Sequence, residues 1–484
     1  MATPIPQNRA PFTVDEIAAA TGGRVVRSGP PSVGVSTDSR AVTRGSAFVA
    51  LSGDRFDGHA FLEGALALGA GTAVVSRDDV RLPLAMVRVD DTKRALGAMA
   101  RAHRERWAAP GTRALVAITG SAGKTTTKTV VAKLLEGLAM GGVHATAGNL
   151  NNDVGVPMTL FGLDERHRFA VVEAGTNARG EIQKLASIAR PDVGVLTLVA
   201  AAHTAGIGSV DDVAIEKGAL FEALPESGLA VVNADDAHAS RQLARTPARA
   251  ARTYGFAAHA DYRITLRRSR GLAGSRLAIE RAGRAVCFDS PLLGDSGALA
   301  VAAALAVTEW LARRPVEAAE LESALGTLVS GAEGRLSPVL LADGTLLIDD
   351  SYNANPASMR ASLATAAELA KERSTRLIAV LGEMRELGEV SGEEHESVGR
   401  FARELGVAHV LGVGGDAERI VRVASAGPGG ASFAADSDLA AEKVVALATA
   451  GDVVLVKGSR GVATEKVVRA LVLARGVTGS GGAG

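Results

Sequence analysis

The sequence predicts an α/β protein built from three domains, and three observations support this. The chain has 484 residues, and domains average roughly 100 to 200 residues, so the length suggests about three of them. Segments with the composition of buried strands alternate with helical segments over most of the chain, which is typical of parallel sheets with right-handed crossovers. A glycine-rich loop near residue 120 joins one such strand directly to a helix.

The first domain is assigned to residues 1–109. Short apolar runs at 47–51 and 71–76 are separated by Gly- and Asp-rich turns, with an Ala- and Leu-rich helix between them. This pattern indicates a small mixed α/β domain. Pro and Gly within residues 105–114 precede a clean strand and mark the first boundary.

The central domain is assigned to residues 110–330 and is expected to be doubly wound. A strand at 114–119 is followed by the glycine-rich loop and a helix. Further strands are expected at 169–175, 193–200 and 228–236. Residues 261–293 alternate apolar and polar side chains around Gly turns, which predicts an antiparallel extension at the sheet edge. Residues 298–311 return to helix.

The third domain is assigned to residues 331–476 and is expected to be a second, Rossmann-like α/β unit. Its strands are expected at 345–349, 376–382, 409–415 and 452–458, with helices between them. Residues 477–484, rich in Gly, are expected to form a flexible tail.

The composition excludes several classes of protein. Lys plus Arg and Asp plus Glu each number 53, so no overall charge excess is available to hold nucleic acid or an anionic membrane. The single cysteine, Cys287, cannot form an internal disulfide, which favours the reducing cytoplasm. The N-terminus does not resemble a signal peptide, and the longest apolar stretch is about half of the roughly 20 residues that a membrane helix needs.

The strongest motif is ITGSAGKTTTK at residues 118–128. Glycines let backbone N–H groups turn toward phosphate oxygens, the lysine neutralises phosphate charge, and the threonine hydroxyl ligates Mg²⁺. The usual longer spacing would place glycine where Ile118 stands, so the loop is a shortened variant. A helix capped after a Gly turn is the alternative. The residues expected to bind ATP here are Gly120, Ser121, Ala122, Gly123, Lys124, Thr125 and Thr126.

Three residues beyond the loop are candidate metal ligands. Glu173 ends a predicted strand at the edge where doubly wound sheets bind ligands, and His203 follows the next strand. Lys217 lies on a helix with one apolar face. The alternatives are that Glu173 caps a helix or lies in water at the sheet edge, that His203 is a structural hydrogen-bonding residue, and that Lys217 is a solvated surface lysine.

These residues together resemble the Mur ligases, ATP-dependent enzymes that build the peptide stem of bacterial cell-wall precursors. The resemblance extends over about residues 14–474 and includes TGSxGKTTTK at Thr119–Lys128. It implies that Glu173 and His203 bind metal, together with Thr125. It also implies that Lys217 reacts with CO2 and that the resulting carbamate supports a second Mg²⁺.

The segment Val35–Phe61 is similar to the uridine-nucleotide-binding domain of the family. Hydroxyl, guanidinium and backbone donors in this segment suit a diphosphate and uracil; an ordinary surface loop rich in Asp and Arg is the alternative. The residues expected to bind the UDP-linked substrate are Ser39, Arg40, Arg55, Asp57 and His59.

The third domain is similar to the branch of the family that adds D-alanyl-D-alanine to a UDP-N-acetylmuramoyl tripeptide. The matching segments are Gly331–Leu336, Leu346–Met359, Leu381–Gly388 and Val454–Gly461, and the Asp-Asn-Pro-Arg run of the neighbouring branch is missing from the sequence. The resemblance implies that Arg335 reaches the γ-phosphate and Asp350 the ATP ribose. Asn149 is expected near the phosphates; Asn152, Tyr352, Asn353 and Asn355 are expected to line the cleft for the second substrate. The alternative interpretation of each asparagine is an ordinary turn residue.

Two departures from the family pattern stand out. Ala300 occupies the position of an Asn that lies near adenine in most relatives, so adenine must be recognised by other groups. The usual Ala-Lys-Gly-Glu run reads Glu216-Lys217-Gly218-Ala219 here. The lysine itself is retained.

The resemblance implies a ligation reaction. ATP phosphorylates the terminal carboxylate of the tripeptide, and the amine of D-alanyl-D-alanine attacks the acyl phosphate, with Lys124, Lys217, Arg335 and two Mg²⁺ ions as the catalytic groups. The third domain is expected to close over the central one, and the enzyme to be a monomer acting on small molecules only. Another amino-acid ligase of this family, or of folate, and an ATPase without a ligation product are the alternatives. No motif reports whether diaminopimelate or lysine is the third residue of the stem, and none supplies an obvious general base.

Overall fold

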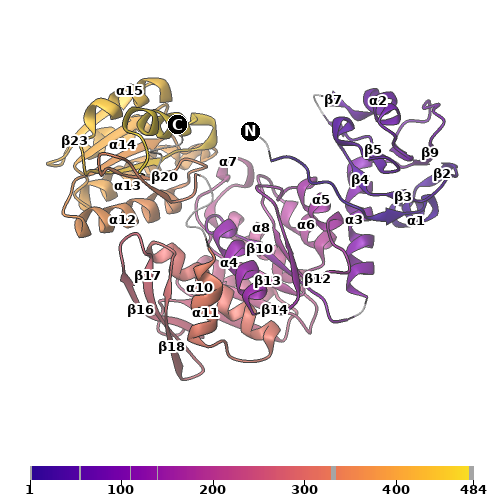
Figure 1. Ribbon diagram of the computed structural model, residues 1–484, viewed down its shortest axis with the longest axis horizontal. Coiled ribbons are helices and arrows are strands. Elements are labelled where there is room, and N and C mark those ends of the chain that lie inside the picture. The colour runs from indigo at the N-terminus through magenta and orange to yellow at the C-terminus, as the bar shows by residue number, and fades with distance from the viewer. Residues whose placement is uncertain (1–2, 54–55, 110, 139, 329–333, 479–484) are drawn as a thin grey trace, which may run out of the picture.

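The computed structural model describes residues 3–53, 56–109, 111–138, 140–328 and 334–478. They form three α/β units in chain order, as the sequence predicts. In Figure 1 the N-terminal unit (indigo) and the C-terminal unit (yellow) stand on opposite sides above the central unit. Both flanking units therefore meet the central one but at different places.

The N-terminal unit is built on a five-stranded sheet with the order β2-β9-β8-β5-β4, in which only the β2–β9 pair is antiparallel. Its strands are β2 (Arg24–Arg27), β4 (Val35–Ser36), β5 (Ala47–Val49), β8 (Thr72–Val75) and β9 (Ala85–Arg88). Two short ladders join β1 (Pro11–Phe12) to β3 (Ser32–Val33) and β6 (Ser52–Gly53) to β7 (Phe56–Asp57). The helices are α1 (Val14–Thr21) and α2 (Leu62–Ala67), with 3₁₀ turns η1 (Ser39–Ala41) and η2 (Gly58–Phe61).

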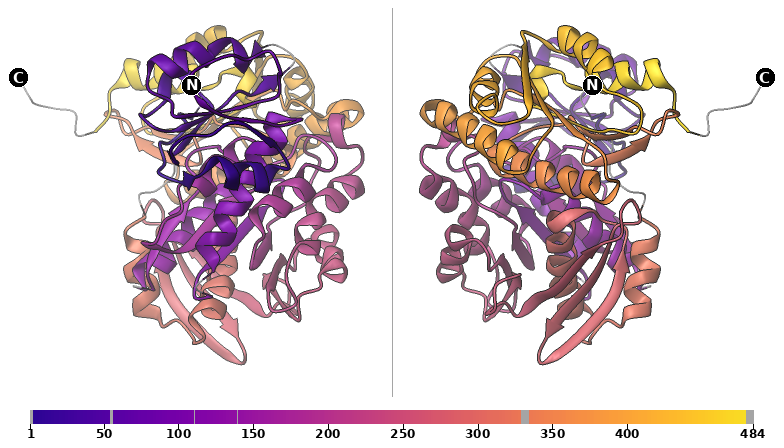
Figure 2. Two further views of the ribbon diagram at one scale, coloured as in Figure 1. Left: turned by 90° about the vertical axis from the view of Figure 1, so that its right-hand side faces the viewer. Right: turned by 90° about the vertical axis from the view of Figure 1, so that its left-hand side faces the viewer.

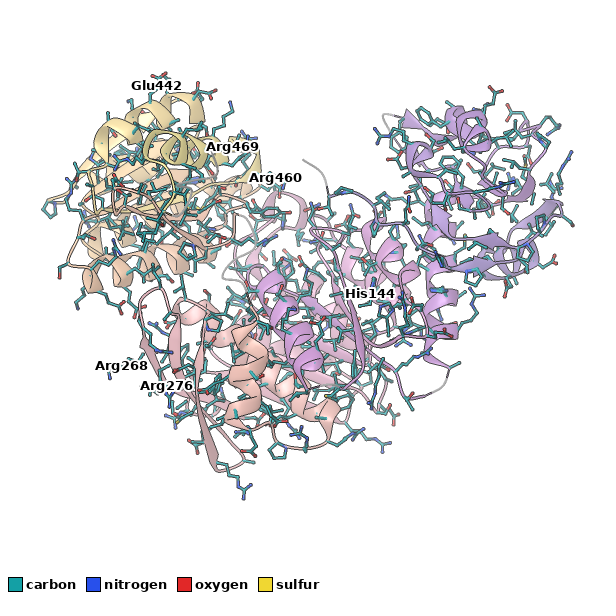
Figure 3. All side chains as sticks on the ribbon, in the orientation of Figure 1. His144, Arg268, Arg276, Glu442, Arg460 and Arg469 are labelled. Carbon is teal, nitrogen blue, oxygen red and sulfur yellow. The ribbon has the colours of Figure 1, made fainter. Side chains whose placement is uncertain are left out.

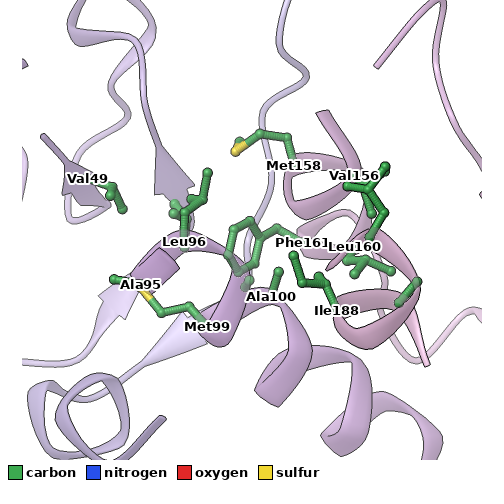
Figure 4. Close-up of a cluster of buried hydrophobic side chains, with 14 of the residues drawn as sticks. Val49, Ala95, Leu96, Met99, Ala100, Val156, Met158, Leu160, Phe161 and Ile188 are labelled. Carbon is green, nitrogen blue, oxygen red and sulfur yellow. The ribbon is translucent and has the colours of Figure 1, made fainter. Parts of the chain in front are cut away.

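Helix α3 (Thr92–Ala108) connects this unit to the central one. Asp91 caps its first turn by accepting hydrogen bonds from the N–H groups of Lys93 and Arg94. The helix packs on α1 of its own unit and on α5 and α6 of the central unit. Figure 4 shows Leu96 and Met99 of α3 among side chains of the central unit, including Phe161. One continuous hydrophobic core therefore joins the two units.

The central unit contains a nine-stranded sheet with the order β11-β12-β10-β13-β14-β15-β16-β17-β18. Its strands are β10 (Ala114–Thr119), β11 (Gly142–Ala145), β12 (His167–Glu173), β13 (Val193–Leu196), β14 (Leu229–Asn233), β15 (Ala250–Gly255), β16 (Tyr262–Ser269), β17 (Ser275–Arg281) and β18 (Arg284–Ser290). Strands β11 to β16 are parallel, and β16 to β18 form the antiparallel extension that the alternating pattern predicts. On β16 and β17 the register partners Arg268 and Arg276 both project outward (Figure 3).

Helices cover both faces of this sheet. They are α4 (Lys124–Gly137), α5 (Gly155–Phe161), α6 (Glu181–Ala189), α7 (Thr204–Ile207), α8 (Val210–Glu222), α9 (Ala237–Ser240), η3 (Arg241–Arg245), α10 (Gly294–Ala312) and α11 (Ala318–Gly326). Helix α10 is longer than the apolar stretch seen in the sequence and could cross a membrane by length and composition alone, but 61% of its most apolar window is buried. Because it packs with α4 and α11 in one core cluster, α10 is a core helix.

The C-terminal unit has a six-stranded sheet with the order β19-β20-β24-β21-β22-β23, parallel except for β19. Its strands are β19 (Ser337–Leu340), β20 (Leu346–Asp350), β21 (Leu377–Gly382), β22 (His409–Val413), β23 (Gly430–Ala434) and β24 (Val453–Lys457). The two edge strands, β19 and β23, were not expected from the sequence. The helices are α12 (Pro356–Glu372), α13 (Ser391–Glu404), α14 (Ala417–Ala424), α15 (Ser437–Leu447) and α16 (Glu465–Arg475), with η4 (Gly388–Val390) and η5 (Arg460–Val462).

The expected flexible tail needs a correction at its start. Val477 forms an antiparallel bridge with Leu341, and the Thr478 N–H donates to the Leu340 carbonyl at 3.2 Å. These two residues therefore extend the sheet edge. Residues 479–484 lie outside the described part of the chain.

The C-terminal unit rests on the central one through α12, which runs along its lower side (Figure 2) and packs against α10. Arg267 on β16 forms a bidentate ion pair with Glu368 on α12, at 2.9 and 2.8 Å. Asp295 pairs with the same guanidinium from the central side. This junction is more polar than the core that holds the N-terminal unit.

Candidate functional site at the phosphate loop

The loop between β10 and α4 is held in shape by the segment after β13. Gly120 has φ +151, and a Cβ there would lie 1.9 Å from the Thr197 hydroxyl, so only glycine fits. The Ser121 N–H donates to the Leu198 carbonyl at 2.6 Å, and the Thr197 hydroxyl donates to Ala122 at 2.6 Å. The loop is therefore preformed. Among the described residues no side chain caps α4 at Gly123, so its first N–H groups are available to an anion.

Lys124 and Thr125 start α4 beside the buried carboxylate of Glu173 on the neighbouring strand. The Thr125 hydroxyl donates to Glu173 Oε2 at 2.8 Å, and Glu173 is 2% exposed. The Lys124 amine donates to the Gly120 carbonyl at 2.7 Å. Burial lowers the pKa of Lys124, Glu173 raises it in part, and the positive charge of Arg335 lowers it further. The structure therefore brings loop, hydroxyl and carboxylate together.

The asparagines after β11 differ in their contacts. Asn151, which the sequence analysis did not single out, donates to Glu173 Oε1 at 2.8 Å. Asn152 Oδ1 accepts from the N–H of Gly155, the first residue of α5, at 2.8 Å, and Asn149 Oδ1 accepts from the Thr3 hydroxyl at 2.6 Å. Asn151 is thus the asparagine in direct contact with a candidate metal ligand.

Lys217 is buried on α8, with 1% of its surface exposed. Among the described residues no hydrogen-bond or ion-pair partner holds its amine. Burial lowers the pKa of Lys217 to about 7, and the positive charge of Lys124 adds to this effect. The adjacent Glu216 faces elsewhere, because its carboxylate accepts from the N–H groups of Gly180 and Ile182 at 2.6 and 2.7 Å. At neutral pH, a large fraction of Lys217 is an uncharged amine.

His203 occupies the N-cap position of α7 with a left-handed backbone, φ +59. Its Nδ1 contacts the carboxylate of Glu386, which comes from the C-terminal unit. Burial lowers the pKa of His203, Glu386 raises it, and the charges of Lys217 and Lys124 lower it. His203 therefore lies within electrostatic reach of both lysines.

The described residues contain no group of three His, Cys, Asp or Glu side chains placed to hold a metal ion. Two donors that are present, the Thr125 hydroxyl and the buried Glu173 carboxylate, are oxygen ligands of the kind that Mg²⁺ prefers. The His203 imidazole would add a nitrogen donor. A site here would be completed by oxygen atoms from the nucleotide or from a carbamate.

Asp350 ends β20 and is held by donors of its own unit. Its carboxylate accepts from the Lys457 amine at 2.6 Å, the Ser362 hydroxyl at 2.5 Å and the Leu336 N–H at 3.0 Å. Lys457 is 2% exposed and also donates to the Asn353 carbonyl at 3.0 Å. Asp350, the expected ribose ligand, is thus already part of a buried ion pair with Lys457. It also holds the backbone at Leu336, directly after Arg335.

The Arg335 guanidinium lies over the ring of Tyr352, with 3.9 Å between the guanidinium carbon and the ring centroid. The Arg460 guanidinium lies 5.1 Å from the same centroid and extends from the C-terminal unit in Figure 3. Asn355 caps α12 and donates through Nδ2 to the Ser121 carbonyl at 2.8 Å. A residue of the C-terminal unit therefore touches the phosphate loop directly.

The expected uridine-nucleotide residues lie around two 3₁₀ turns beside α2. Ser39 and Arg40 are in η1, where Arg40 is exposed and pairs with Asp38 at 2.7 Å. His59 in η2 is buried, contacts Asp57 through Nδ1 at 2.5 Å and accepts from the Ser76 N–H through Nε2 at 3.0 Å. Hydrogen bonds from His59 lower the pKa of Asp57. Both His59 nitrogens are thus used within the fold, while Arg55 lies outside the described residues.

Models of Mur ligase domains match three stretches of this chain. The Mur ligase family catalytic-domain model matches residues 32–104, the middle-domain model 118–308, and the glutamate ligase domain model 334–460. The UDP-N-acetylmuramoyl-tripeptide--D-alanyl-D-alanine ligase of Escherichia coli is 38% identical over 447 residues, which cover 90% of this chain and 93% of that protein. The chain belongs to the Mur ligase family.

Solved structures agree with this Mur ligase over nearly its whole length. A crystal structure of MurF from Acinetobacter baumannii aligns with a TM-score of 0.86 and 29% identity, covering 96% of this chain and 100% of that one. MurF from Thermotoga maritima in complex with ADP aligns with a TM-score of 0.78 and 27% identity, covering 91% and 97%. The three-unit α/β architecture is therefore that of the family.

Several side chains that shape the site of this Mur ligase were not assigned to it from the sequence. They are Asn151, Thr197, Glu386 and Lys457. Three of these lie in motifs that the sequence analysis cited or in loops next to them, so proximity to a motif was the available signal. Ala300, at the position of the adenine-side Asn in relatives, is 3% exposed within α10.

Proposed function

We propose that this Mur ligase joins D-alanyl-D-alanine to the terminal carboxyl group of UDP-N-acetylmuramoyl-tripeptide, converting ATP to ADP and phosphate. The names of the E. coli and other relatives support the substrates. The observation that carries the proposal is the meeting of Lys124, Glu173 and Asn355 around one preformed phosphate loop. A nucleotide on the central unit is thereby within reach of groups from the C-terminal unit.

In the first step an oxygen of the acceptor carboxylate attacks the γ-phosphorus and ADP leaves, which gives an acyl phosphate. The amine of D-alanyl-D-alanine then attacks the carbonyl carbon, the C–O bond to phosphate breaks, and the amine gives up a proton. Lys124 at the loop and Arg335 above it would offset negative charge on the transferring phosphoryl group. The stacking of Arg335 on Tyr352 would hold the guanidinium in place without using its N–H donors.

Two Mg²⁺ ions would complete this site. Thr125 and Glu173 would hold one, and His203 with a carbamate on Lys217 the second; bound Mg²⁺ would polarise phosphoryl oxygens. Lys217 suits carbamate formation because it is buried, unpaired among the described residues and, with a pKa of about 7, about half uncharged at neutral pH. Asn151 would orient the Glu173 carboxylate.

The remaining assignments follow the family pattern. The UDP end of the acceptor would lie on the N-terminal unit near Ser39 and Arg40, and Asn152, Tyr352 and Asn353 would line the cleft for the second substrate. Asn149 would approach the phosphates, and Asp350 the ribose once a donor is displaced. The enzyme would act as a cytoplasmic monomer.

The test is to incubate the enzyme with ATP, D-alanyl-D-alanine and each UDP-tripeptide, and to detect pentapeptide by mass. Pentapeptide and phosphate should form only when all three substrates are present. Phosphate release in the absence of both D-alanyl-D-alanine and UDP-tripeptide would instead support an ATPase. A ligation product with another amino acid would support a different ligase. Lys124→Ala should abolish product while the melting temperature stays within a few degrees. Turnover retained by that variant would contradict the site.

A further inference from the structure

The contact between α7 and the loop after β21 is the closest approach of the C-terminal unit to a proposed metal ligand. The Glu386 carboxylate contacts His203 Nδ1. Two hydrogen bonds flank this pair: the Ala205 N–H donates to the Glu386 carbonyl at 3.1 Å, and the Thr204 hydroxyl donates to the Leu387 carbonyl at 2.7 Å. Helix α7 and the loop after β21 are therefore joined by hydrogen bonds next to the pair as well as by the pair itself.

Both residues of the pair have an unusual backbone conformation. His203 has φ +59 and Glu386 has φ +66, a region that residues other than glycine seldom adopt. Gly388, at φ +57, lies so close to Ala205 that a Cβ would be 3.3 Å from its Cα. Strained backbone on both sides of one contact indicates that the contact is built into the fold.

The pairing determines which nitrogen of His203 can bind a metal. An ionised carboxylate only accepts hydrogen bonds, so Nδ1 carries the proton and Nε2 keeps its lone pair. Histidines that bind metals usually donate their other N–H to a carboxylate or carbonyl, which fixes the ring and raises its basicity. The positive charges of Lys217 and Lys124 act on the same ring and lower the pKa of His203.

We propose that Glu386 is a positioning residue that orients His203 across the domain junction, so that the metal site is complete only when the C-terminal unit is docked. This inference rests on the proposed metal role of His203. It extends the metal role of His203, because the affinity for the metal then depends on the position of the C-terminal unit. In the proposed arrangement that unit supplies no metal ligand itself. Docking and metal binding then stabilise each other.

The test measures binding of Mn²⁺, as a probe for Mg²⁺, to the full chain with a non-hydrolysable ATP analogue. Titration is followed by calorimetry and electron paramagnetic resonance. Glu386→Ala should lower the affinity of the enzyme for the weaker-bound Mn²⁺ ion by about 10- to 100-fold. Glu386→Gln keeps an acceptor oxygen and should recover most of that loss. Glu389→Ala, in the same loop with an exposed side chain, is the matched control and should bind as the wild type does.

Two further variants separate orientation from docking and from the metal role itself. Thr204→Val removes the neighbouring hydrogen bond but leaves the carboxylate; a loss equal to that of Glu386→Ala would overturn the proposal. The double variant His203→Ala, Glu386→Ala should bind no more weakly than His203→Ala alone, and additive losses would also overturn it. If His203→Ala leaves Mn²⁺ binding unchanged, the proposed metal role fails. If only His203→Ala weakens binding, the role of Glu386 fails alone.

Discussion

Lys217 should react with dissolved CO2 far more readily than the exposed lysines of this enzyme. Only the uncharged amine attacks CO2, and burial lowers the pKa of Lys217 to about 7. At pH 8 about 90% of such an amine is uncharged, against about 0.3% for a lysine with its ordinary pKa, a ratio of about 300. At pH 6 the uncharged fraction of Lys217 falls to about 9%, so the rate of carbamate formation should fall about tenfold at constant dissolved CO2. Because the reaction also releases a proton, the equilibrium amount of carbamate should fall by more than about tenfold.

The assay is carbon NMR of the enzyme equilibrated with ¹³C-labelled bicarbonate, in which a lysine carbamate gives a separate resonance. The wild type should show one carbamate at pH 8 that weakens toward pH 6, and Lys217→Met should show none. Lys133→Met is the control, because Lys133 is a half-buried lysine whose amine pairs with Glu136 at 3.0 Å. A resonance that survives in Lys217→Met, or its absence from the wild type at pH 8, would refute the reasoning.

Three other predictions concern stability and domain contact. In CO2-free buffer Lys217→Met should be more stable than the wild type at pH 7, by on the order of 4 kcal/mol. Between pH 7 and 10 the unfolded chain holds a proton on Lys217 that the folded chain has lost, so the stability of the wild type should rise toward that of the variant as the pH increases. If urea unfolding shows the same difference in free energy at pH 7 and at pH 10, the prediction is wrong. Arg104→Met removes the ion-pair partner of Asp192 at the α3 interface, while Asp192 still accepts from the Leu115 N–H at 2.8 Å. Because the Asp192 side chain is 34% exposed, the free energy of unfolding should fall by about 1 to 3 kcal/mol, again measured by urea unfolding. Asn355→Ser keeps the cap of α12 but cannot reach Ser121; the KM for ATP should rise about 2- to 10-fold with no change in melting temperature.

Regular structure was predictable wherever strands are apolar and helices amphipathic. The phosphate-loop strand, the antiparallel extension and the core strands of the C-terminal sheet are at the expected places. Strand β23 has the sequence Gly-Ala-Ser-Phe-Ala and only one buried residue, so its apolar signal is weak. It forms because β22 offers an open edge, and that tertiary effect cannot be read from a local pattern.

The site was predictable where a motif is contiguous and unpredictable where units meet. Lys124, Thr125 and Glu173 are brought together by neighbouring parallel strands. The contact of Glu386 with His203 joins residues 183 positions apart, and no local pattern indicates it. His59 shows the converse, since a residue matched to a binding motif uses both ring nitrogens to hold its own loop.

The core shared by α3 and the central unit restricts which parts of the enzyme can move. Swinging the N-terminal unit away would expose Phe12, Met99 and Phe161 to water, at a cost of about 1.5 to 3 kcal/mol for each buried side chain. The C-terminal unit shares a smaller apolar contact with the central one, at Ala201 and Leu293, and the ion pairs and hydrogen bonds beside it can be replaced by water. Thermal motion should therefore leave the first two units as a single rigid platform, and the catalytic cycle should be paced by the release and return of the third.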